Sequence, residues 1–290
     1  MTDESPPRLP TRNRTARPSG RHRRGQTSDL PPEAPALVPV MPAGPAAGDD
    51  LAKTMADTIA DELPGVMADA YPGLDIHVAR LGGPGDPGDL DEILAAVSAA
   101  RPGAPAAAVV APLITGPYPE FTDAVRAVTG DRGVVTGPLG PHPLLAQALH
   151  ERLAASGLAR PDRVRMLGLV TAADGVIVAT AGGGEAVRAA DMTAVLLASR
   201  LAVPVVPASL NGSLQVSAVA DRMRETGAAR IAVAPYVIGP EADLGRMNAE
   251  ARNAGAECAA PIGAHPAVAR LLSLGYEMAL DELRIGYMDT

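Results

Sequence analysis

Apolar runs and amphipathic segments alternate along the chain from residue 36 onward, and Gly- and Pro-rich turns separate them. The run AAAVVAPLI, Ala106–Ile114, contains no charged residue and leads into the loop TGPYPEF, with Glu120 at its tip. Uninterrupted apolar runs of this length are typical of strands that are buried on both faces of a parallel sheet. A similar sequence, ARIAVAPYVIGPEADL, occupies residues 229–244. The repetition indicates a duplicated structural unit.

The same patterns predict strands that alternate with helices over the rest of the chain. In residues 51–63, Leu51, Met55, Ile59 and Leu63 recur at fourfold spacing, which is typical of one buried helix face. Alternation of strands with helices favours an α/β protein with a parallel sheet covered on both faces. The predicted strands and apolar runs are 36–41, 74–81, 106–114, 133–139, 163–170, 175–180, 203–208, 230–238 and 257–262, and the predicted helices are 51–63, 90–100, 122–128, 144–156, 185–200, 216–226, 247–254 and a last helix after GAHP.

The order of motifs occurs twice. ALVPVMPAG is matched by GVIVATAGG, and GPLGPHPLLAQAL is matched by APIGAHPAVARLL. We therefore predict two similar halves with parallel sheets, residues 35–158 and 163–290. Residues 1–34 are rich in Pro, Ser, Thr and Arg and contain few apolar residues, so we expect a disordered tail.

Charge and composition bear on whether the tail and the body can bind nucleic acids or other anionic partners. The tail carries seven arginines against four acidic residues, so the remainder is more acidic than the net charge of −8 suggests. The tail suits either a nucleic acid or anionic surface, or a solvated extension without a partner. The body, with one Phe and no Trp, lacks the stacking platform of single-strand binders. The sequence thus argues against nucleic-acid binding by the body.

The single cysteine and the lack of long apolar runs argue against an extracellular or membrane protein. Cys258 is the sole cysteine, which excludes an intramolecular disulfide and a cysteine-based zinc site. No apolar run approaches the ~18 residues of a membrane helix, and no apolar segment follows the N-terminal arginines as in a secretory signal. We expect a cytoplasmic protein. The oligomeric state is not determined by these features.

His142 and His265 are the sharpest candidates for chemistry. Each lies in a Gly-x-His-Pro turn that opens a predicted helix, and ligands of parallel sheets bind beyond the carboxyl ends of the strands. Neutral imidazole binds cobalt, nickel, iron or zinc. A histidine at this position can equally cap the helix, with Pro at the first helical position. The pattern leaves both interpretations open.

Carboxylates and glycines follow other predicted strands. Glu120 and Asp243 occupy equivalent loop tips, where they either hold a divalent cation and take up protons or are simply solvated. Gly44 follows the first strand, and Gly182, Gly183 and Gly184, with Arg188 behind them, can hold an anion at a helix start. The glycine run matches neither nucleotide-binding fingerprint, so we expect no nucleotide.

Four segments of the chain resemble the sirohydrochlorin chelatase family, the class II cobalto- and ferrochelatases, and in particular its two-domain actinobacterial type. These segments are VVAPLITGPYPEF, GPLGPHPLLAQALHERL, IAVAPYVIGP and APIGAHPAVARLL. The resemblance implies two flavodoxin-like halves. It also implies insertion of a divalent metal (cobalt, iron or nickel) into a tetrapyrrole without nucleotide hydrolysis.

The chain departs from the family where the family's metal-binding histidines lie. Pro42 stands where the resemblance implies the first histidine, Glu120 where it implies the second, and Asp243 is the counterpart in the second copy. One hypothesis is a chelatase that uses Glu120, Asp243, His142 and His265 instead, with Glu120 as the catalytic group. The other is an inactive homologue that binds metal or tetrapyrrole or acts as a scaffold.

Overall fold

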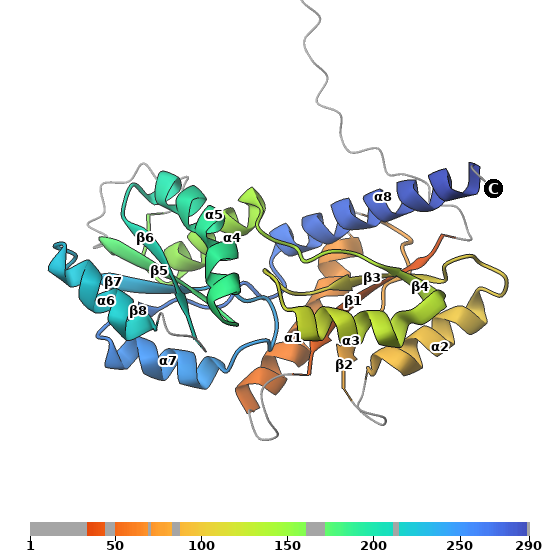
Figure 1. The fold of residues 1–290 in the computed structure, drawn as a ribbon, viewed down its shortest axis with the longest axis horizontal. Coiled ribbons are helices and arrows are strands. Elements are labelled where there is room, and N and C mark those ends of the chain that lie inside the picture. The colour runs from red at the N-terminus through yellow and green to blue at the C-terminus, as the bar shows by residue number, and fades with distance from the viewer. Residues whose placement is uncertain are drawn as a thin grey trace, which may run out of the picture.

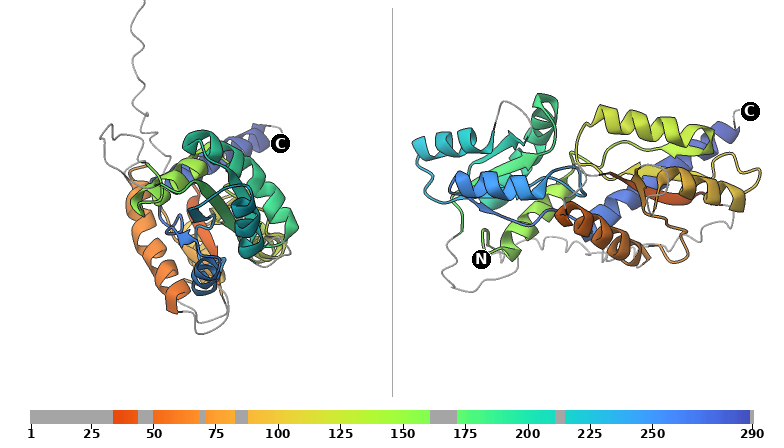
Figure 2. Two further views of the ribbon diagram at one scale, coloured as in Figure 1. Left: turned by 90° about the vertical axis from the view of Figure 1, so that its left-hand side faces the viewer. Right: turned by 90° about the horizontal axis from the view of Figure 1, so that it is seen from below.

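Two parallel four-stranded sheets form the framework of the computed structural model, which describes residues 34–43, 50–68, 71–82, 88–160, 172–210 and 215–288, with side chains up to residue 283. The first sheet has the order β2-β1-β3-β4 and the second the order β6-β5-β7-β8. The sheets lie side by side with their helices (Figures 1 and 2). The strands are β1 (Ala36–Pro42), β2 (Ala79–Leu81), β3 (Ala108–Pro112), β4 (Gly133–Val135), β5 (Gly175–Thr180), β6 (Val205–Ser209), β7 (Ile231–Pro235) and β8 (Glu257–Cys258).

Helices connect the strands in both halves. They are α1 (Asp50–Ala68), α2 (Leu90–Ala100), α3 (Pro119–Thr129), α4 (Pro143–Ala155), α5 (Gly184–Leu201), α6 (Val216–Glu225), α7 (Leu244–Asn253) and α8 (Pro266–Met288), with a short 3₁₀ turn at Gly130–Arg132. The central strands β1, β3, β5 and β7 are buried along their whole length, as the apolar runs predict. The predicted fold class, an α/β duplication with flavodoxin-like halves, is confirmed.

The last helix of each half packs on the other half. Helix α4 contacts α5 and β7, whereas α8 contacts β3 and α1. Figure 1 shows α8 lying along the half that contains β1 to β4. The Tyr276 hydroxyl of α8 donates a 2.8 Å hydrogen bond to the Pro35 carbonyl, just before β1. Because of this exchange, one apolar cluster contains residues of both halves, among them Leu37, Val109, Val176 and Ala232.

Three edge strands are shorter than the apolar pattern predicts. The segment predicted at 133–139 pairs regularly only over β4, because Gly137 and Pro138 interrupt it and proline has no N–H to donate. In the segment predicted at 74–81, an isolated bridge at Ile76 precedes the three-residue β2. β8 likewise ends before Pro261. An apolar pattern indicates which residues are buried. Because burial extends beyond the hydrogen-bonded part of an edge strand, the pattern predicts a strand that is too long.

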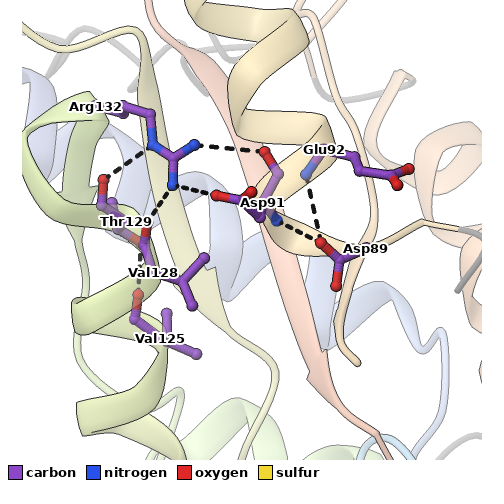
Figure 3. A network of polar contacts seen from close by, with 7 residues as sticks. All are labelled: Asp89, Asp91, Glu92, Val125, Val128, Thr129 and Arg132. Carbon is purple, nitrogen blue, oxygen red and sulfur yellow. Dashed lines mark hydrogen bonds and ion pairs between the residues drawn. The ribbon is translucent and has the colours of Figure 1, made fainter. Parts of the chain in front are cut away.

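A polar network joins the ends of α2 and α3 on the outer face of the first sheet (Figure 3). The Asp89 carboxylate caps α2 by accepting the backbone N–H of Asp91 at 2.9 Å and of Glu92 at 3.4 Å. Arg132, just after α3, donates to the Asp91 carboxylate at 2.7 Å and also to the Val128 carbonyl. Arg132 thus links the end of α3 to the first turn of α2.

Some predictions lie outside the described residues. These are the tail (residues 1–33), Gly44 and the apolar run at 163–170. None of the helices within the described ranges is long and apolar enough to span a membrane.

Candidate functional site

The two copies of the repeated motif meet where the halves join. Thr115, in the loop after β3, donates from Oγ1 to the Tyr236 carbonyl at 2.8 Å. Tyr236, directly after β7, donates its hydroxyl to the Thr115 carbonyl at 3.3 Å and accepts from Thr193 Oγ1 at 3.0 Å. Burial raises the pKa of Tyr236 to about 12, against a smaller effect of the Thr193 hydrogen bond, so the phenol stays neutral. The loop after β3 and the loop after β7 are therefore joined by two hydrogen bonds.

Gly140 allows a third loop to join this contact. A β-carbon at this position would lie 2.3 Å from the Thr115 carbonyl oxygen and 2.4 Å from the Tyr236 hydroxyl. Both distances are shorter than any real contact, so only glycine fits without a shift of the backbone. The loop between β4 and α4 is thereby held against both copies of the motif.

The loop after β7 also lies against the carboxyl end of β1. A β-carbon built on Gly239 would be 3.5 Å from Met41 Cγ and 3.4 Å from a Glu241 carboxylate oxygen. Glu241 accepts the backbone N–H groups of Ile238 and Gly239, both at 2.6 Å. Burial raises its pKa to about 8, and the backbone hydrogen bonds oppose this rise. A carboxyl group whose pKa is raised to about 8 therefore lies close to the end of β1, where Pro42 follows Met41.

A cavity of about 540 Å³ lies between α1 and the second half. The first turns of α1 and α7, the carboxyl ends of β7 and β8 and the β8–α8 loop form its walls. Figure 1 shows α1 near α7, and the two helices are in contact. The cavity thus lies at the carboxyl ends of the strands, where parallel sheets bind ligands. Its lining is mostly apolar, with Arg152, Glu62 and Asn248 among its polar side chains.

Arg152 of α4 crosses to the second half beside this cavity. Its Nε and Nη2 atoms donate to the Ile262 carbonyl at 3.1 and 2.5 Å. The side chain is partly buried and lines the cavity. Arg152 reaches this position because α4 packs on the second half. In the sequence it lies inside a predicted helix, and nothing in that pattern indicates a binding role.

Both candidate histidines cap helices. His142 Nδ1 accepts the backbone N–H of Leu144 at 3.1 Å, and His265 Nδ1 accepts that of Ala267 at 3.1 Å. His265 Nε2 lies 3.1 Å from the Glu151 carboxylate of α4. Burial lowers the pKa of His265, Glu151 opposes this effect and Arg152 adds to it. Nδ1 of both rings therefore makes the bond that the capping interpretation predicts, and His265 adds a contact to Glu151 through Nε2.

The two histidines do not share a site. His142 lines a second cavity of about 540 Å³, which lies between the loop after β4 and α8. His265 is buried, with only 8% of its surface exposed, next to the residues that close the first cavity. Each half uses its histidine to begin the helix that it exchanges with the other half.

Glu120 and Asp243 are exposed at helix starts. Glu120 lies in the first turn of α3, and Asp243 caps α7 by accepting the backbone N–H of Arg246 at 2.7 Å. Within the described ranges, no three His, Cys, Asp or Glu side chains gather as a metal site. Glu120, Asp243, His142 and His265 lie at the starts of four different helices, α3, α7, α4 and α8, and do not form such a group.

The glycine run begins α5. Gly182 has a φ of +97°, and its carbonyl accepts from Ser209 Oγ at 2.5 Å. Gly183 caps the helix without a side-chain hydrogen bond, and Arg188 is exposed, with Nη1 3.8 Å from a β-carbon built on Gly184. An arginine and a helix start thus lie together here, apart from the lining of either cavity described above.

Comparison with known proteins gives a fold likeness. No protein-family model and no curated protein matches the sequence. Bacillus subtilis SirB with Fe³⁺ superposes with a TM-score of 0.61 at 16% identity, covering 84% of this chain and 95% of SirB. SirB of Bacillus subtilis subspecies spizizenii, a sirohydrochlorin chelatase in complex with cobalt, gives 0.58 at 15% identity with the same coverage. The chain has the fold of the sirohydrochlorin chelatases.

A third solved structure of this fold is CbiX, described as the terminal enzyme for biosynthesis of siroheme in denitrifying bacteria. It matches with a TM-score of 0.57 at 16% identity, over 84% of this chain and 99% of CbiX. The chelatase fold therefore covers nearly the full length of each of these proteins. In this chain, β1 ends in Pro42. Sequence reasoning missed Arg152, Glu241, Thr115 and Tyr236 as residues at the junction of the halves.

Proposed function

We propose that this protein binds a tetrapyrrole between its two halves, as a chelatase-like protein without a resident metal site. The observation that carries the proposal is the cavity of about 540 Å³ at the carboxyl ends of β7 and β8, closed by α1 of the other half. A mostly apolar lining with a few polar side chains suits a large, flat ligand of mixed character. The chelatase fold supports the class of ligand.

The residues that the sequence singles out are poorly suited to metal insertion, and this favours binding of a tetrapyrrole without insertion. Proline at position 42 can neither coordinate a metal nor accept a proton. Glu120 and Asp243 are exposed at the starts of different helices. His142 and His265 use Nδ1 to cap helices. In metal insertion, a divalent ion such as cobalt or iron would be a substrate. We infer that these side chains do not provide a set of ligands for that ion.

A second candidate function, metal insertion, is favoured by one observation. Insertion of M²⁺ releases two pyrrole protons, which a nearby base accepts. Glu241 lies near the end of β1. With a pKa of about 8 it is mostly protonated at pH 7, but its ionised form is a stronger base than an ordinary carboxylate, and this form can accept one of these protons. Under this candidate, Glu241 replaces Glu120 as the proton acceptor.

An anaerobic spectroscopic titration separates the two functions. Purified protein is mixed with sirohydrochlorin alone, and then with cobalt(II), iron(II) or nickel(II), against a control without protein. A spectral shift on adding protein without faster metal insertion supports the binding function. Insertion above the background rate that Glu241→Gln abolishes supports the chelatase. Absence of both effects contradicts the tetrapyrrole proposal.

The cellular setting and the division of the chain are part of the same proposal. The single cysteine, Cys258, suits a reducing cytoplasm. The halves at 35–158 and 163–290 each supply one sheet, and each gives its last helix to the other. A ligand in the cavity would contact both halves at once.

A further inference from the structure

We infer that Arg152 recognises a carboxylate group of the ligand that occupies the cavity between α1 and α7. The inference rests on the proposed tetrapyrrole binding and names the residue that selects an acidic ligand. It starts from the position of Arg152, which belongs to α4 of the first half but lines a cavity whose remaining walls come from α1 and the second half.

Arg152 differs in its partner from the other partly buried arginines of the described residues. Arg80, Arg101, Arg132 and Arg230 each pair with a carboxylate within 2.5 to 2.8 Å. Arg152 instead donates to the neutral carbonyl of Ile262, and among the described residues no carboxylate forms an ion pair with it. A partly buried cation whose charge is not compensated by a pair favours an anion from outside.

Two acidic residues lie beside Arg152, one next to it in the sequence and one in the cavity lining. Glu151, the preceding residue, uses its two carboxylate oxygens for His265 Nε2 at 3.1 Å and Gln147 Nε2 at 2.8 Å. Glu62 lines the cavity from α1 and is exposed. Neither makes an ion pair with Arg152 among the bonds of the described side chains.

The guanidinium of Arg152 keeps donors that a ligand could use. The Ile262 carbonyl holds the edge that carries Nε and Nη2. Nη1, with two further N–H donors, makes no hydrogen bond within the part of the chain that the structure describes. A guanidinium that is held in place by a neutral group loses little conformational entropy when it binds a carboxylate, and the resulting charge-assisted bond is strong.

The other walls define the rest of the ligand. Leu51, Ile59, Leu244 and Met247 give the cavity apolar surfaces, while Thr54 and Asn248 add neutral polar groups. A small charged metabolite would leave these apolar surfaces uncovered. The lining therefore fits a carboxylate that is attached to a large apolar body, which is the character of an acidic tetrapyrrole.

The test is an equilibrium titration of sirohydrochlorin into the full-length protein, followed by the absorbance of the pigment. Arg152→Met should weaken binding by about tenfold or more, and Arg152→Lys should lose less, because it keeps the charge but not the fork. Arg126→Met is the matched control, since Arg126 is exposed on α3 and pairs only with Asp123. It should bind as the wild type does.

Two further measurements keep the inference testable if Arg152→Met fails to fold. The methyl-esterified pigment should bind the wild-type protein about tenfold more weakly than the free acid, because the ester carries no charge for Arg152. Thr58→Trp places a large side chain on the exposed face of α1 that lines the cavity, and it should abolish binding of the acid.

The outcomes separate this inference from the proposed function. If the wild-type protein binds the pigment and Arg152→Met binds it equally well, Arg152 does not recognise the ligand, and the tetrapyrrole proposal stands. Equal binding of acid and ester has the same meaning. If the wild-type protein does not bind the pigment at all, both the inference and the proposed function fail.

Discussion

Thr115 and Tyr236 exchange hydrogen bonds across the junction of the two halves, the threonine hydroxyl to the tyrosine carbonyl at 2.8 Å and the tyrosine hydroxyl to the threonine carbonyl at 3.3 Å. Both residues follow the central strand of their own half, within the two copies of the repeated motif. The duplication therefore supplies the contact by which the halves recognise each other. Pro235, the residue before Tyr236, lines the proposed ligand cavity, so this contact lies next to the cavity wall.

Removal of the Tyr236 hydroxyl should destabilise the whole molecule. Tyr236→Phe leaves Thr193 Oγ1 and the Thr115 carbonyl without a buried partner, which costs about 1–3 kcal/mol of unfolding free energy. The measurement is urea denaturation followed by circular dichroism. Tyr118→Phe, at a tyrosine with 38% of its surface exposed, is the control. Equal stability of the two variants would contradict the role assigned to Tyr236.

A methyl group at Gly140 should separate the three loops. Gly140→Ala places its β-carbon about 2.3 Å from the Thr115 carbonyl oxygen, so the loop has to move. We expect a loss of about 1–3 kcal/mol in unfolding free energy and weaker ligand binding. Gly137→Ala in the same loop is the control, since nothing lies within 4 Å of its β-carbon position. A destabilisation by Gly137→Ala as large as that by Gly140→Ala would argue against the specific contact.

The stability of the protein should fall as the pH rises toward 8, and Glu241 is the cause. Burial raises the pKa of this carboxyl from 4.5 to about 8, so the folded state holds a proton that the unfolded chain releases. The stabilisation from this proton is complete below pH 4.5 and disappears as the pH rises to about 8.

Glu241→Gln should remove this contribution to the pH dependence. Thermal denaturation of the wild type and the variant between pH 5 and 9 provides the measurement, with Glu120→Gln as the exposed control. The two stability profiles should differ in slope for Glu241→Gln only. Parallel profiles would mean that Glu241 titrates as an ordinary carboxylate.

His265 should produce the opposite slope at lower pH. Its pKa is lowered below 6.5, mainly by burial, so the folded state binds a proton less well than the unfolded chain. The neutral ring stabilises the fold above pH 6.5, and this stabilisation is lost as the pH falls through the lowered pKa.

His265→Asn tests this contribution, because asparagine keeps an acceptor for the Ala267 N–H but does not titrate. The variant should lose stability less steeply than the wild type between pH 7 and 5 in urea denaturation. An unchanged slope in His265→Asn would contradict the effect of burial on this ring.

Local patterns were enough to predict the strands of the interior and the duplication. β1 and β3 are apolar along their length and buried on both faces, and the helix predicted at 90–100 is α2 as observed. The repeat of Gly-x-His-Pro placed both histidines at helix starts, which the caps of His142 and His265 satisfy. These features are decided within a few residues by side-chain volume, polarity and turn geometry, so a single sequence carries them.

The tertiary structure alone decided the exchange of α4 and α8 and everything that depends on it. Thr115 and Tyr236 are 121 positions apart, and Arg152 and Ile262 are 110 positions apart. The hydrophobic periodicity of a sequence does not indicate which helix and sheet faces pack together over such separations. Their meeting depends on the burial of apolar surface between whole elements. This packing brings Arg152 to the cavity beside α1 and places His142 and His265 at the starts of different helices.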